Sequence, residues 1–244
     1  MMPLPPRCFA EVDDLQPGGA VALSEAEFRH LAQVRRLPGG SEVLLLNGKG
    51  VLAAGTLEIQ GKRGGLVRLT EVKNLPPPAP WIRLCVGGLK NAAWEEVLRH
   101  AVELGVNELV WVGSTHAVAE VKADRSEAKL ERWRERCRQA CKQSANPWLP
   151  VLRVTAGVGE ALALQPAPAR RLVAALLPET EAWRRALGDA GALEIWVGPE
   201  GDFTAEEMAM LRQCEAVPVS LGPRICRAET AALACLARVR LQDS

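Results

Sequence analysis

The spacing of apolar positions changes along the chain and separates a first region from the rest. Ser24 and Glu27 form a capping-box pair ahead of apolar residues at helical spacing over 28–37, which predicts a helix. Residues 41–59 then contain two β-like runs on either side of Asn-Gly-Lys-Gly, a strong hairpin signal, and 64–72 add another strand. We therefore expect residues 1–75 to form a small, mostly β domain.

A proline-rich stretch, Pro-Pro-Pro-Ala-Pro at 76–80, follows this region and predicts a linker, because consecutive prolines favour an extended backbone. From 81 to 244, β-like and helical runs alternate, including a long charged helix over about 126–144. This alternation predicts a second, α/β domain with a mainly parallel sheet and helices on both faces. Ligands of such sheets bind beyond the carboxyl ends of the strands.

The bulk composition narrows the class of protein. Apolar residues make up 48% and charged residues 24%, and no apolar run reaches the roughly 18–20 residues of a membrane span. The first residues contain prolines instead of a signal-peptide pattern, so we expect a cytoplasmic protein with no membrane partner. The seven cysteines include no C-x-x-C pair, which favours free thiols and no bound metal. The net charge of +1 means that a nucleic-acid partner must be argued from local features.

Two turns at predicted strand ends carry the candidate chemistry. The first, in IWVGPEGDFTAEEM, ends a strand at Gly198 and begins a helix with a capping box formed by Thr204 and Glu207. Glycines at 198 and 201 allow the backbone angles or the close ligand approach that a side chain would prevent. A simple connecting loop explains this turn equally well.

The second turn, SLGPRICRAET, repeats the plan of strand, Gly-Pro and helix start. It places Arg224 and Arg227 at a helix N-terminus, where positive charge is unfavourable unless an anion or polar ligand binds there. Glu229 is either a first-turn carboxylate favoured by the helix dipole or a catalytic group. We treat all three as candidate catalytic residues.

The combination GPEGDFT and LGPRICRAETA, together with ELGV, KQS and HLAQVRRL, resembles the RsmE-type methyltransferases of the SPOUT superfamily. The resemblance implies an N-terminal PUA-like β-barrel for RNA and a C-terminal SPOUT domain with a deep trefoil knot. The pattern alone predicts a plain doubly wound sheet, since knots are rare. It also implies a homodimer that uses S-adenosyl-L-methionine to methylate N3 of a uridine in 16S rRNA, in the small ribosomal subunit or its precursor.

Site residues carried over by position follow from this resemblance. The implied cofactor contacts are Leu176, Leu177 and Pro178, then Gly198, Pro199, Glu200 and Gly201, and finally Leu221, Gly222, Ile225, Cys226 and Arg227. The enzyme would mainly hold the acceptor nitrogen in line with an already activated methyl group. Arg224 and Arg227 would stabilise the negative charge on the uracil carbonyl oxygens as N3 loses its proton, with Glu229 as base or as orienting partner.

Basic side chains on two predicted helices could meet RNA phosphates. Residues 122–142 contain eight Lys or Arg and four Asp or Glu, and a solvated, ion-paired helix explains this excess equally well. The predicted RNA-binding residues are Arg29, Arg35 and Arg36 on the first helix and Arg134, Arg138 and Lys142 on the long one. Trp133 and Trp148 are predicted either to stack on bases or, more in keeping with tryptophan in general, to pack inside the protein.

Some positions depart from what the resemblance leads us to expect. His100, His116 and Asn146 stand where a basic residue is usual, and Asp202 stands where glycine is frequent. These three replacements of basic residues reduce the fixed positive charge. They motivate an alternative, a catalytically inactive RNA-binding or ribosome-assembly factor with the same fold. A nucleotide-binding α/β enzyme is a further alternative, disfavoured because neither G-x-G-x-x-G nor a P-loop motif is present.

Overall fold

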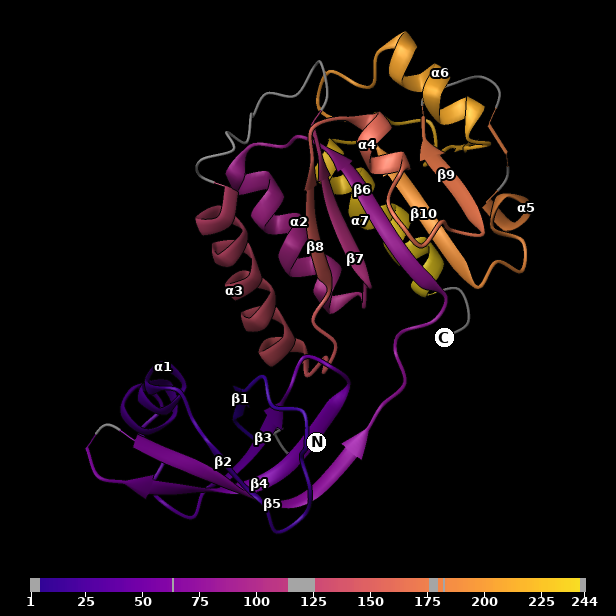
Figure 1. Cartoon of the computed structure of the whole chain (residues 1–244). Coiled ribbons are helices and arrows are strands. Elements are labelled where there is room, and N and C mark those ends of the chain that lie inside the picture. Colours follow the sequence, from indigo (N-terminus) through magenta and orange to yellow (C-terminus); the bar gives the residue numbers. More distant parts are fainter. Residues whose placement is uncertain (1–4, 63, 114–125, 176–179, 182, 242–244) are drawn as a thin grey trace. The chain divides into compact units, whose positions relative to one another are not determined.

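A computed structural model describes residues 5–62, 64–113, 126–175, 180–181 and 183–241 of the chain. The chain divides into two compact units (Figure 1). The first unit comprises Met1–Pro77 together with Arg138–Leu149, and the second comprises Pro78–Cys137 and Pro150–Ser244. A segment from the middle of the sequence therefore belongs to the first unit, which the sequence pattern did not indicate.

The first unit is built on a five-stranded sheet, as the β-rich pattern predicts. Its strand order is β1 (Arg7–Phe9), β3 (Glu42–Leu46), β4 (Val51–Gln60), β5 (Gly64–Asn74) and β2 (Ala20–Ala22). All neighbours are antiparallel except β1 and β3. Apolar side chains on alternate positions of these strands form its core with Phe28 and Leu31.

The predicted hairpin about Asn-Gly-Lys-Gly joins β3 to β4. The side-chain oxygen of Asn47 accepts hydrogen bonds from the backbone N–H groups of Lys49 and Val51, both at 2.9 Å. Its amide nitrogen donates to the Val12 carbonyl at 3.2 Å, so this buried side chain is satisfied at both ends. The predicted hairpin is confirmed. Its turn is held by contacts within a few residues, which is why the local sequence was enough to locate it.

The prediction of a helix that starts with the Ser24–Glu27 capping box and continues through 28–37 is only partly correct. The α-helix α1 (Glu25–Phe28) is one turn long and continues as a π-helical segment, η1 (Arg29–Val34). The Glu27 backbone N–H donates to Ser24 Oγ at 3.2 Å, but the Glu27 carboxylate accepts from Lys142 Nζ at 2.5 Å and from the Phe9 N–H at 3.3 Å. The capping box is therefore incomplete, because the buried ammonium of Lys142 requires the carboxylate as its partner.

Lys142 belongs to α3 (Ser126–Ser144), whose bounds agree with the prediction, and to the segment Arg138–Leu149 of the first unit. This segment is bonded to the sheet of that unit at several backbone positions. The Gly50 N–H donates to the Pro147 carbonyl and the Leu149 N–H to the Gly48 carbonyl, both at 3.0 Å. The Trp148 indole N–H donates to the Pro76 carbonyl at 2.9 Å. The segment thus completes the first unit.

The second unit contains a six-stranded sheet in which every neighbouring pair is parallel, which confirms the expected architecture. The strand order is β11 (Val217–Val219), β9 (Arg170–Ala174), β10 (Ala192–Val197), β6 (Trp81–Gly87), β7 (Glu108–Val112) and β8 (Val151–Thr155). Strand β8 was not predicted. It lies at the edge of the sheet and alternates exposed with half-buried positions, so it lacks the apolar run that marks the central strands.

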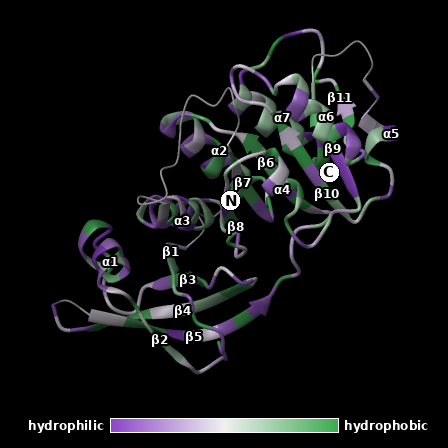
Figure 2. Cartoon of the chain, turned by 45° about the horizontal axis from the view of Figure 1, so that its top comes forward, coloured by the Kyte–Doolittle hydropathy of each residue, from purple (hydrophilic) through white to green (hydrophobic). Residues whose placement is uncertain are grey.

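Helices cover both faces of this sheet (Figure 1). Helices α4 (Val158–Leu162) and α6 (Ala205–Gln213) pack on one face, and α2 (Asn91–Glu103) and α7 (Ala228–Arg240) pack together on the other. Helix α5 (Trp183–Leu187) lies beside β11. The central strands β6 and β7 are hydrophobic along most of their length (Figure 2), as expected for strands covered on both sides.

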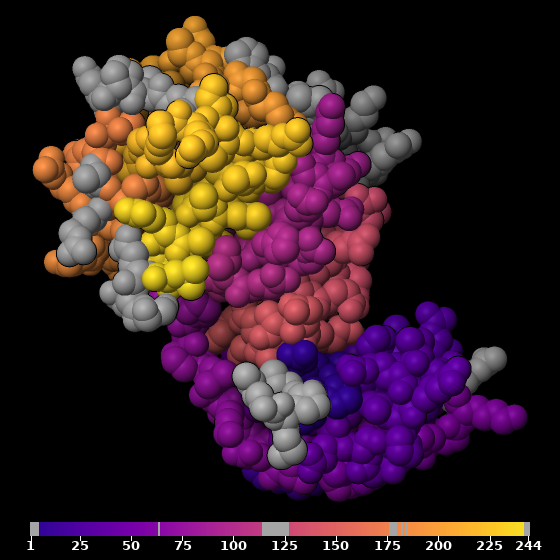
Figure 3. All heavy atoms as spheres, turned by 180° about the vertical axis from the view of Figure 1, so that it is seen from behind, coloured from indigo at the N-terminus to yellow at the C-terminus, as the bar shows by residue number. Residues whose placement is uncertain are grey.

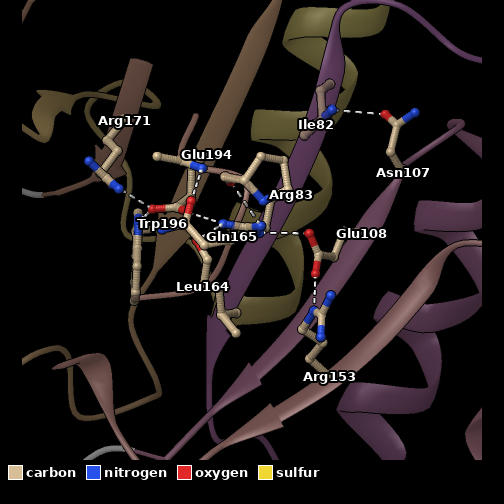
Figure 4. Close-up of polar contacts among 12 residues, drawn as sticks. Ile82, Arg83, Asn107, Glu108, Arg153, Leu164, Gln165, Arg171, Glu194 and Trp196 are labelled. Atoms are coloured by element: carbon tan, nitrogen blue, oxygen red, sulfur yellow. Dashed lines mark hydrogen bonds and ion pairs between the residues drawn. The ribbon is translucent and has the colours of Figure 1, made fainter. Parts of the chain in front are cut away.

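A row of charged side chains crosses the amino-terminal half of this sheet (Figure 4). At its centre, the fully buried guanidinium of Arg83 on β6 contacts Glu108 on β7 at 2.7 Å and Glu194 on β10 at 2.8 Å. Glu108 also pairs with Arg153 on β8, and Glu194 pairs with Arg171 on β9 at 2.9 Å. Alternating charges thus join five adjacent strands.

Arg83 also bonds to backbone outside the sheet. Its two terminal nitrogens donate to the carbonyl oxygens of Leu164 and Pro166, both at 3.3 Å, which ties the chain after α4 to the sheet. Burial is the largest single effect on the pKa of Arg83 and lowers it, but hydrogen bonds and charge attraction from both carboxylates together outweigh burial and raise the pKa, so the side chain stays charged. The row fixes the register of three neighbouring strands, because a shift of any one would leave a charge buried without its partner.

We predict that Arg83→Met lowers the free energy of unfolding by about 3–5 kcal/mol, because it leaves two buried carboxylates and two carbonyl oxygens short of a donor. Arg153→Met is the matched control. It removes a pair to the same Glu108, but the Arg153 side chain is 43% exposed, so the loss should stay below ~1 kcal/mol. Urea unfolding followed by tryptophan fluorescence measures both. Equal losses in the two variants would contradict a central role for Arg83.

Candidate active site

A pocket of about 320 Å³ opens at the carboxyl ends of β9 and β10, beside the start of α7. Its walls come from three places in the sequence: the end of β9, the loop after β10 and the loop before α7. The lining residues are Ala174, Ala175, Val197, Gly198, Pro199, Glu200, Asp202, Leu221, Arg224, Ile225, Cys226, Arg227, Ala228 and Ala231. Both strand-end turns singled out from the sequence therefore contribute to one site.

The loop after β10 comes close to the neighbouring strand β6. A Cβ atom on Gly87, the last residue of β6, would lie 2.4 Å from Pro199 Cδ, so only glycine allows this approach. The loop closes with a hydrogen bond from the Asp202 N–H to the Pro199 carbonyl at 2.9 Å. The predicted capping box then begins α6, with Thr204 and Glu207 bonded reciprocally at 2.9 and 3.1 Å.

The loop before α7 is held by polar contacts at its first residues. The Trp183 indole N–H donates to the Ser220 carbonyl at 2.8 Å, and the Ser220 hydroxyl accepts from the Gly222 N–H at 3.1 Å. Arg227 occupies the N-cap position of α7 and makes no side-chain capping bond. Its carbonyl accepts from the Ala231 N–H at 2.8 Å, so the helix begins there and the side chain is left for another role.

The charges of the pocket are divided between its two loops. The loop after β10 supplies the carboxylates of Glu200 and Asp202, and the loop before α7 supplies the guanidiniums of Arg224 and Arg227. Both arginines are exposed, and neither forms an ion pair or side-chain hydrogen bond with any residue that the structure describes. Two such cations beside an apolar-lined cavity suit a ligand that carries or develops negative charge.

The predicted site residues divide into three groups. Those that line the pocket are Gly198, Pro199, Glu200, Leu221, Arg224, Ile225, Cys226 and Arg227. Those near it that do not line it are Gly201, Gly222 and Glu229. Leu176, Leu177 and Pro178 lie outside the described residues. The Ile225 side chain is 83% exposed, so it lies at the rim of the pocket.

Sequence reasoning missed the small and apolar residues that form the pocket walls, namely Ala174, Ala175, Val197, Ala228 and Ala231, and one polar residue, Asp202. The alanines carry no chemical signal in a sequence. Asp202 could have been found, since it follows Gly201 directly in the first strand-end turn.

The predicted RNA-binding residues differ in what surrounds them. Arg29, Arg35 and Arg36 are exposed on η1 and the turn after it. Arg134 is exposed and pairs with Glu131 at 3.3 Å. Arg138 pairs with Glu11 at 2.8 Å, and Lys142 is buried against Glu27. The last two are therefore engaged in ion pairs with residues far away in the sequence, which differ from the local pairs of the solvated-helix interpretation.

Other polar groups of the sequence analysis have local roles. Burial, together with nearby Lys142, lowers the pKa of His30, so this side chain adds no positive charge at neutral pH. His100 lies beside Glu103, with Nδ1 3.0 Å from the carboxylate. The side-chain oxygen of Asn146 accepts from the Trp148 N–H at 3.0 Å. His116 lies outside the described residues.

Trp133 is buried and meets Trp94 edge-to-face, with ring centroids 5.5 Å apart. This is the packing role, and the indole of Trp133 is not accessible to a base.

The cysteines are free, and burial raises the pKa of Cys8, Cys141 and Cys235 to about 12. These three are protonated thiols at neutral pH and poor metal ligands. Among the residues described, no group of three or more His, Cys, Asp or Glu is arranged to hold a metal ion. No helix in the described parts of the chain is long and apolar enough to cross a membrane.

Comparison with known proteins agrees with this geometry. Residues 76–240 match the RNA methyltransferase domain, and residues 23–70 match the RNA methyltransferase PUA domain. A ribosomal RNA small subunit methyltransferase E from Mycobacterium bovis is 31% identical over 238 residues, covering 96% of this chain and 91% of the relative. The protein of the same name from Synechocystis is 27% identical, covering 90% of this chain and 72% of the relative.

Solved structures show the same fold. A ribosomal RNA small subunit methyltransferase E from Neisseria gonorrhoeae, bound to S-adenosyl methionine, has a TM-score of 0.86 and 26% identity, covering 98% of this chain and 97% of that one. A methyltransferase from Legionella pneumophila superposes with a TM-score of 0.88 at 24% identity, with 97% of each chain covered. The expected fold class, a parallel α/β sheet with an N-terminal PUA domain, is thereby confirmed, while the trefoil knot stays a prediction. The chain belongs to the ribosomal RNA small subunit methyltransferase E family of RNA methyltransferases.

Proposed function

We propose that this protein transfers a methyl group from S-adenosyl-L-methionine to N3 of a uridine in 16S rRNA, in the small ribosomal subunit or its precursor. The observation that carries this proposal is the pocket at the carboxyl ends of β9 and β10, lined by eight of the residues that the family resemblance assigns to the site. Family membership supports the reaction, and the S-adenosyl methionine bound in the Neisseria gonorrhoeae structure supports the cofactor.

The pocket residues suit the charge changes of this reaction. When bound, the cofactor supplies an activated methyl group. The N3–H of uracil must be lost, and negative charge then develops on the two flanking carbonyl oxygens. Arg224 and Arg227 lie exposed on one loop without described polar partners and can stabilise this charge.

Glu229 lies in the first turn of α7, two residues after Arg227, and does not line the pocket. This place supports a role in orienting an arginine over a role as the base.

The RNA surface that we propose is on the first unit. Arg29, Arg35 and Arg36 are exposed there within eight residues of one another, and they meet no described carboxylate. Arg134 adds an exposed charge on α3 of the second unit. The PUA match of residues 23–70 includes the three arginines of the first unit and supports their contact with rRNA phosphates.

We propose further that the protein is a homodimer and that it is cytoplasmic. Leu233 and Ala237 lie on the partly exposed side of α7, and Leu241, its C-cap residue, continues their four-residue spacing and is 61% exposed. Seen from behind, the residues of α7, in yellow, form a broad surface next to those of α2, in magenta (Figure 3). An apolar stripe of this kind suits a second copy of the chain. A cytoplasmic location follows from the proposed ribosomal substrate.

We predict that Arg224→Ala and Arg227→Ala each lower kcat by about 10²-fold or more, the usual effect of removing one group that stabilises a developing anion. Transfer of labelled methyl groups to unmodified small subunits measures the rate, and mass spectrometry of the rRNA locates the product. Arg212→Ala is the control, because Arg212 is an exposed arginine of α6 outside the pocket.

Wild-type rates in both pocket variants would refute the assigned role of the arginines. An absence of transfer by the wild-type protein would favour the alternative of an inactive RNA-binding or assembly factor.

We also predict that the triple variant Arg29→Ala, Arg35→Ala and Arg36→Ala binds rRNA more weakly and with a smaller salt dependence. The slope of log K against log salt should fall by about two to three, since each phosphate contact contributes roughly 0.7–0.9. Filter binding across a salt series measures this slope. Arg68→Ala is the control in the same unit, because the Arg68 guanidinium already pairs with Glu58 at 2.6 Å. An unchanged slope in the triple variant would place the RNA surface elsewhere.

A further inference from the structure

The pocket contains two carboxylates that the proposed mechanism does not use, those of Glu200 and Asp202. We propose that Asp202 makes the pocket prefer the positively charged methyl donor over the uncharged product that remains after transfer. This inference rests on the proposed function and assigns to Asp202 the discrimination between S-adenosyl-L-methionine and S-adenosyl-L-homocysteine.

The position of the carboxylate is determined by its contacts in the loop. Asp202 Oδ1 accepts a hydrogen bond from the Phe203 N–H at 2.8 Å, and the Asp202 N–H donates to the Pro199 carbonyl at 2.9 Å. A Cβ atom built on Gly198 would lie 2.7 Å from Asp202 Oδ1. The carboxylate therefore lies over the backbone at the carboxyl end of β10, where only glycine leaves room for it, and it forms part of the pocket wall.

The backbone at this position would suit glycine better. Asp202 has a φ of 60°, in the left-handed region that costs most side chains free energy and that glycine adopts freely. Aspartate is among the residues that tolerate this region, and Asp202 is exposed. A carboxylate held at an unfavourable backbone angle in a ligand pocket motivates a role in binding.

The charge of the two ligands differs by one unit. The methyl donor carries a sulfonium, an ammonium and a carboxylate, which leaves it with a net charge of +1, whereas the product has lost the sulfonium charge and is neutral. In the transfer the S–CH₃ bond breaks, sulfur keeps the electron pair, and the N3–CH₃ bond forms as the anionic base becomes neutral. In this inference, the sulfonium lies on the side of the pocket that the loop after β10 forms. A carboxylate on that side attracts the donor and loses its partner once transfer is complete.

The division of charge in the pocket supports this arrangement. Both carboxylates, of Glu200 and Asp202, come from the loop after β10, and both arginines come from the loop before α7. A site that brings a cationic donor to an anionic acceptor needs negative groups for the first and positive groups for the second. The loop with Asp202 supplies the negative charge for the donor, and the loop with Arg224 supplies the positive charge for the acceptor.

The test measures the affinities of the whole protein for S-adenosyl-L-methionine and S-adenosyl-L-homocysteine by calorimetry. Asp202→Asn keeps the side-chain oxygen and removes the charge. We expect it to weaken donor binding roughly fivefold, the factor that corresponds to about 1 kcal/mol for an exposed charge pair, and to change product binding by less than about twofold. The effect on the donor should shrink at high salt.

Glu215→Gln is the matched control. Glu215 is an exposed carboxylate at a φ of 59° in the same unit, and it does not line the pocket, so both affinities should stay at the wild-type values. Asp202→Gly is a second variant, which relieves the backbone angle. It should show the same loss of discrimination without a lower melting temperature, whereas a purely structural role for Asp202 would lower it.

Equal weakening of both ligands, or no change in either, would overturn the inference, because Asp202 would then contact a part shared by the two molecules or neither molecule. Failure of the wild-type protein to bind the donor would instead refute the proposed function, so the two failures are distinguishable.

Discussion

The contact of Arg83 with Glu108 and Glu194 is the constraint on which the second unit depends. It lies where no water reaches it, so each charge requires its partner, and the three partners come from adjacent parallel strands. Parallel strands do not follow one another through short turns, and their pairing brings together segments far apart in sequence. The pocket lies at the carboxyl ends of β9 and β10, and the charged row crosses the amino-terminal halves of the same two strands. The alignment of these strands therefore determines which residues of the end of β9 and the loop after β10 face one another.

The pocket itself shows how little side-chain bulk such a site requires. Nine of its fourteen lining residues are glycine, alanine, proline or one of the aliphatic residues Val197, Leu221 and Ile225, and its four charged groups come from two loops. Small residues keep a cavity open between a strand end and a helix start. The charged residues make one side of this cavity negative and the other side positive. A ligand with opposite charges at its reacting centre would meet a different sign on each loop. This arrangement suits the methyl transfer that we propose for this protein.

The sequence predicted those parts of the structure that local signals determine. The hairpin at Asn47, the capping box at Thr204 and the bounds of α3 were confirmed because turn chemistry and helical periodicity act over a few residues. The predicted capping box at Ser24 is incomplete because Lys142, more than a hundred residues away, bonds to the Glu27 carboxylate. No local pattern reports such a contact.

The same distinction applies to the site. Motif resemblance found the arginines and the Gly-Pro-Glu-Gly turn, but the alanine walls depend on which strands are neighbours. The left-handed angle of Asp202 and the role of Gly87 likewise emerge only when the loop after β10 is placed against β6. Sequence patterns indicate which residues have chemistry, whereas tertiary contacts decide which residues share a cavity.

The interruption of the first unit by residues of the second has a consequence for synthesis on the ribosome. Its sheet is complete by Pro77. Lys142, which pairs with Glu27, and Trp148, whose indole donates to the Pro76 carbonyl, are translated only with the segment Arg138–Leu149. At about 5–20 residues per second, the nascent N-terminal strands wait roughly 4–14 s for this segment. During that interval the β3–β4 hairpin lacks the two backbone hydrogen bonds that Pro147 and Leu149 supply, and the half-buried Glu27 carboxylate lacks its ammonium partner. The first unit therefore gains its full set of contacts only after more than half of the chain has been translated.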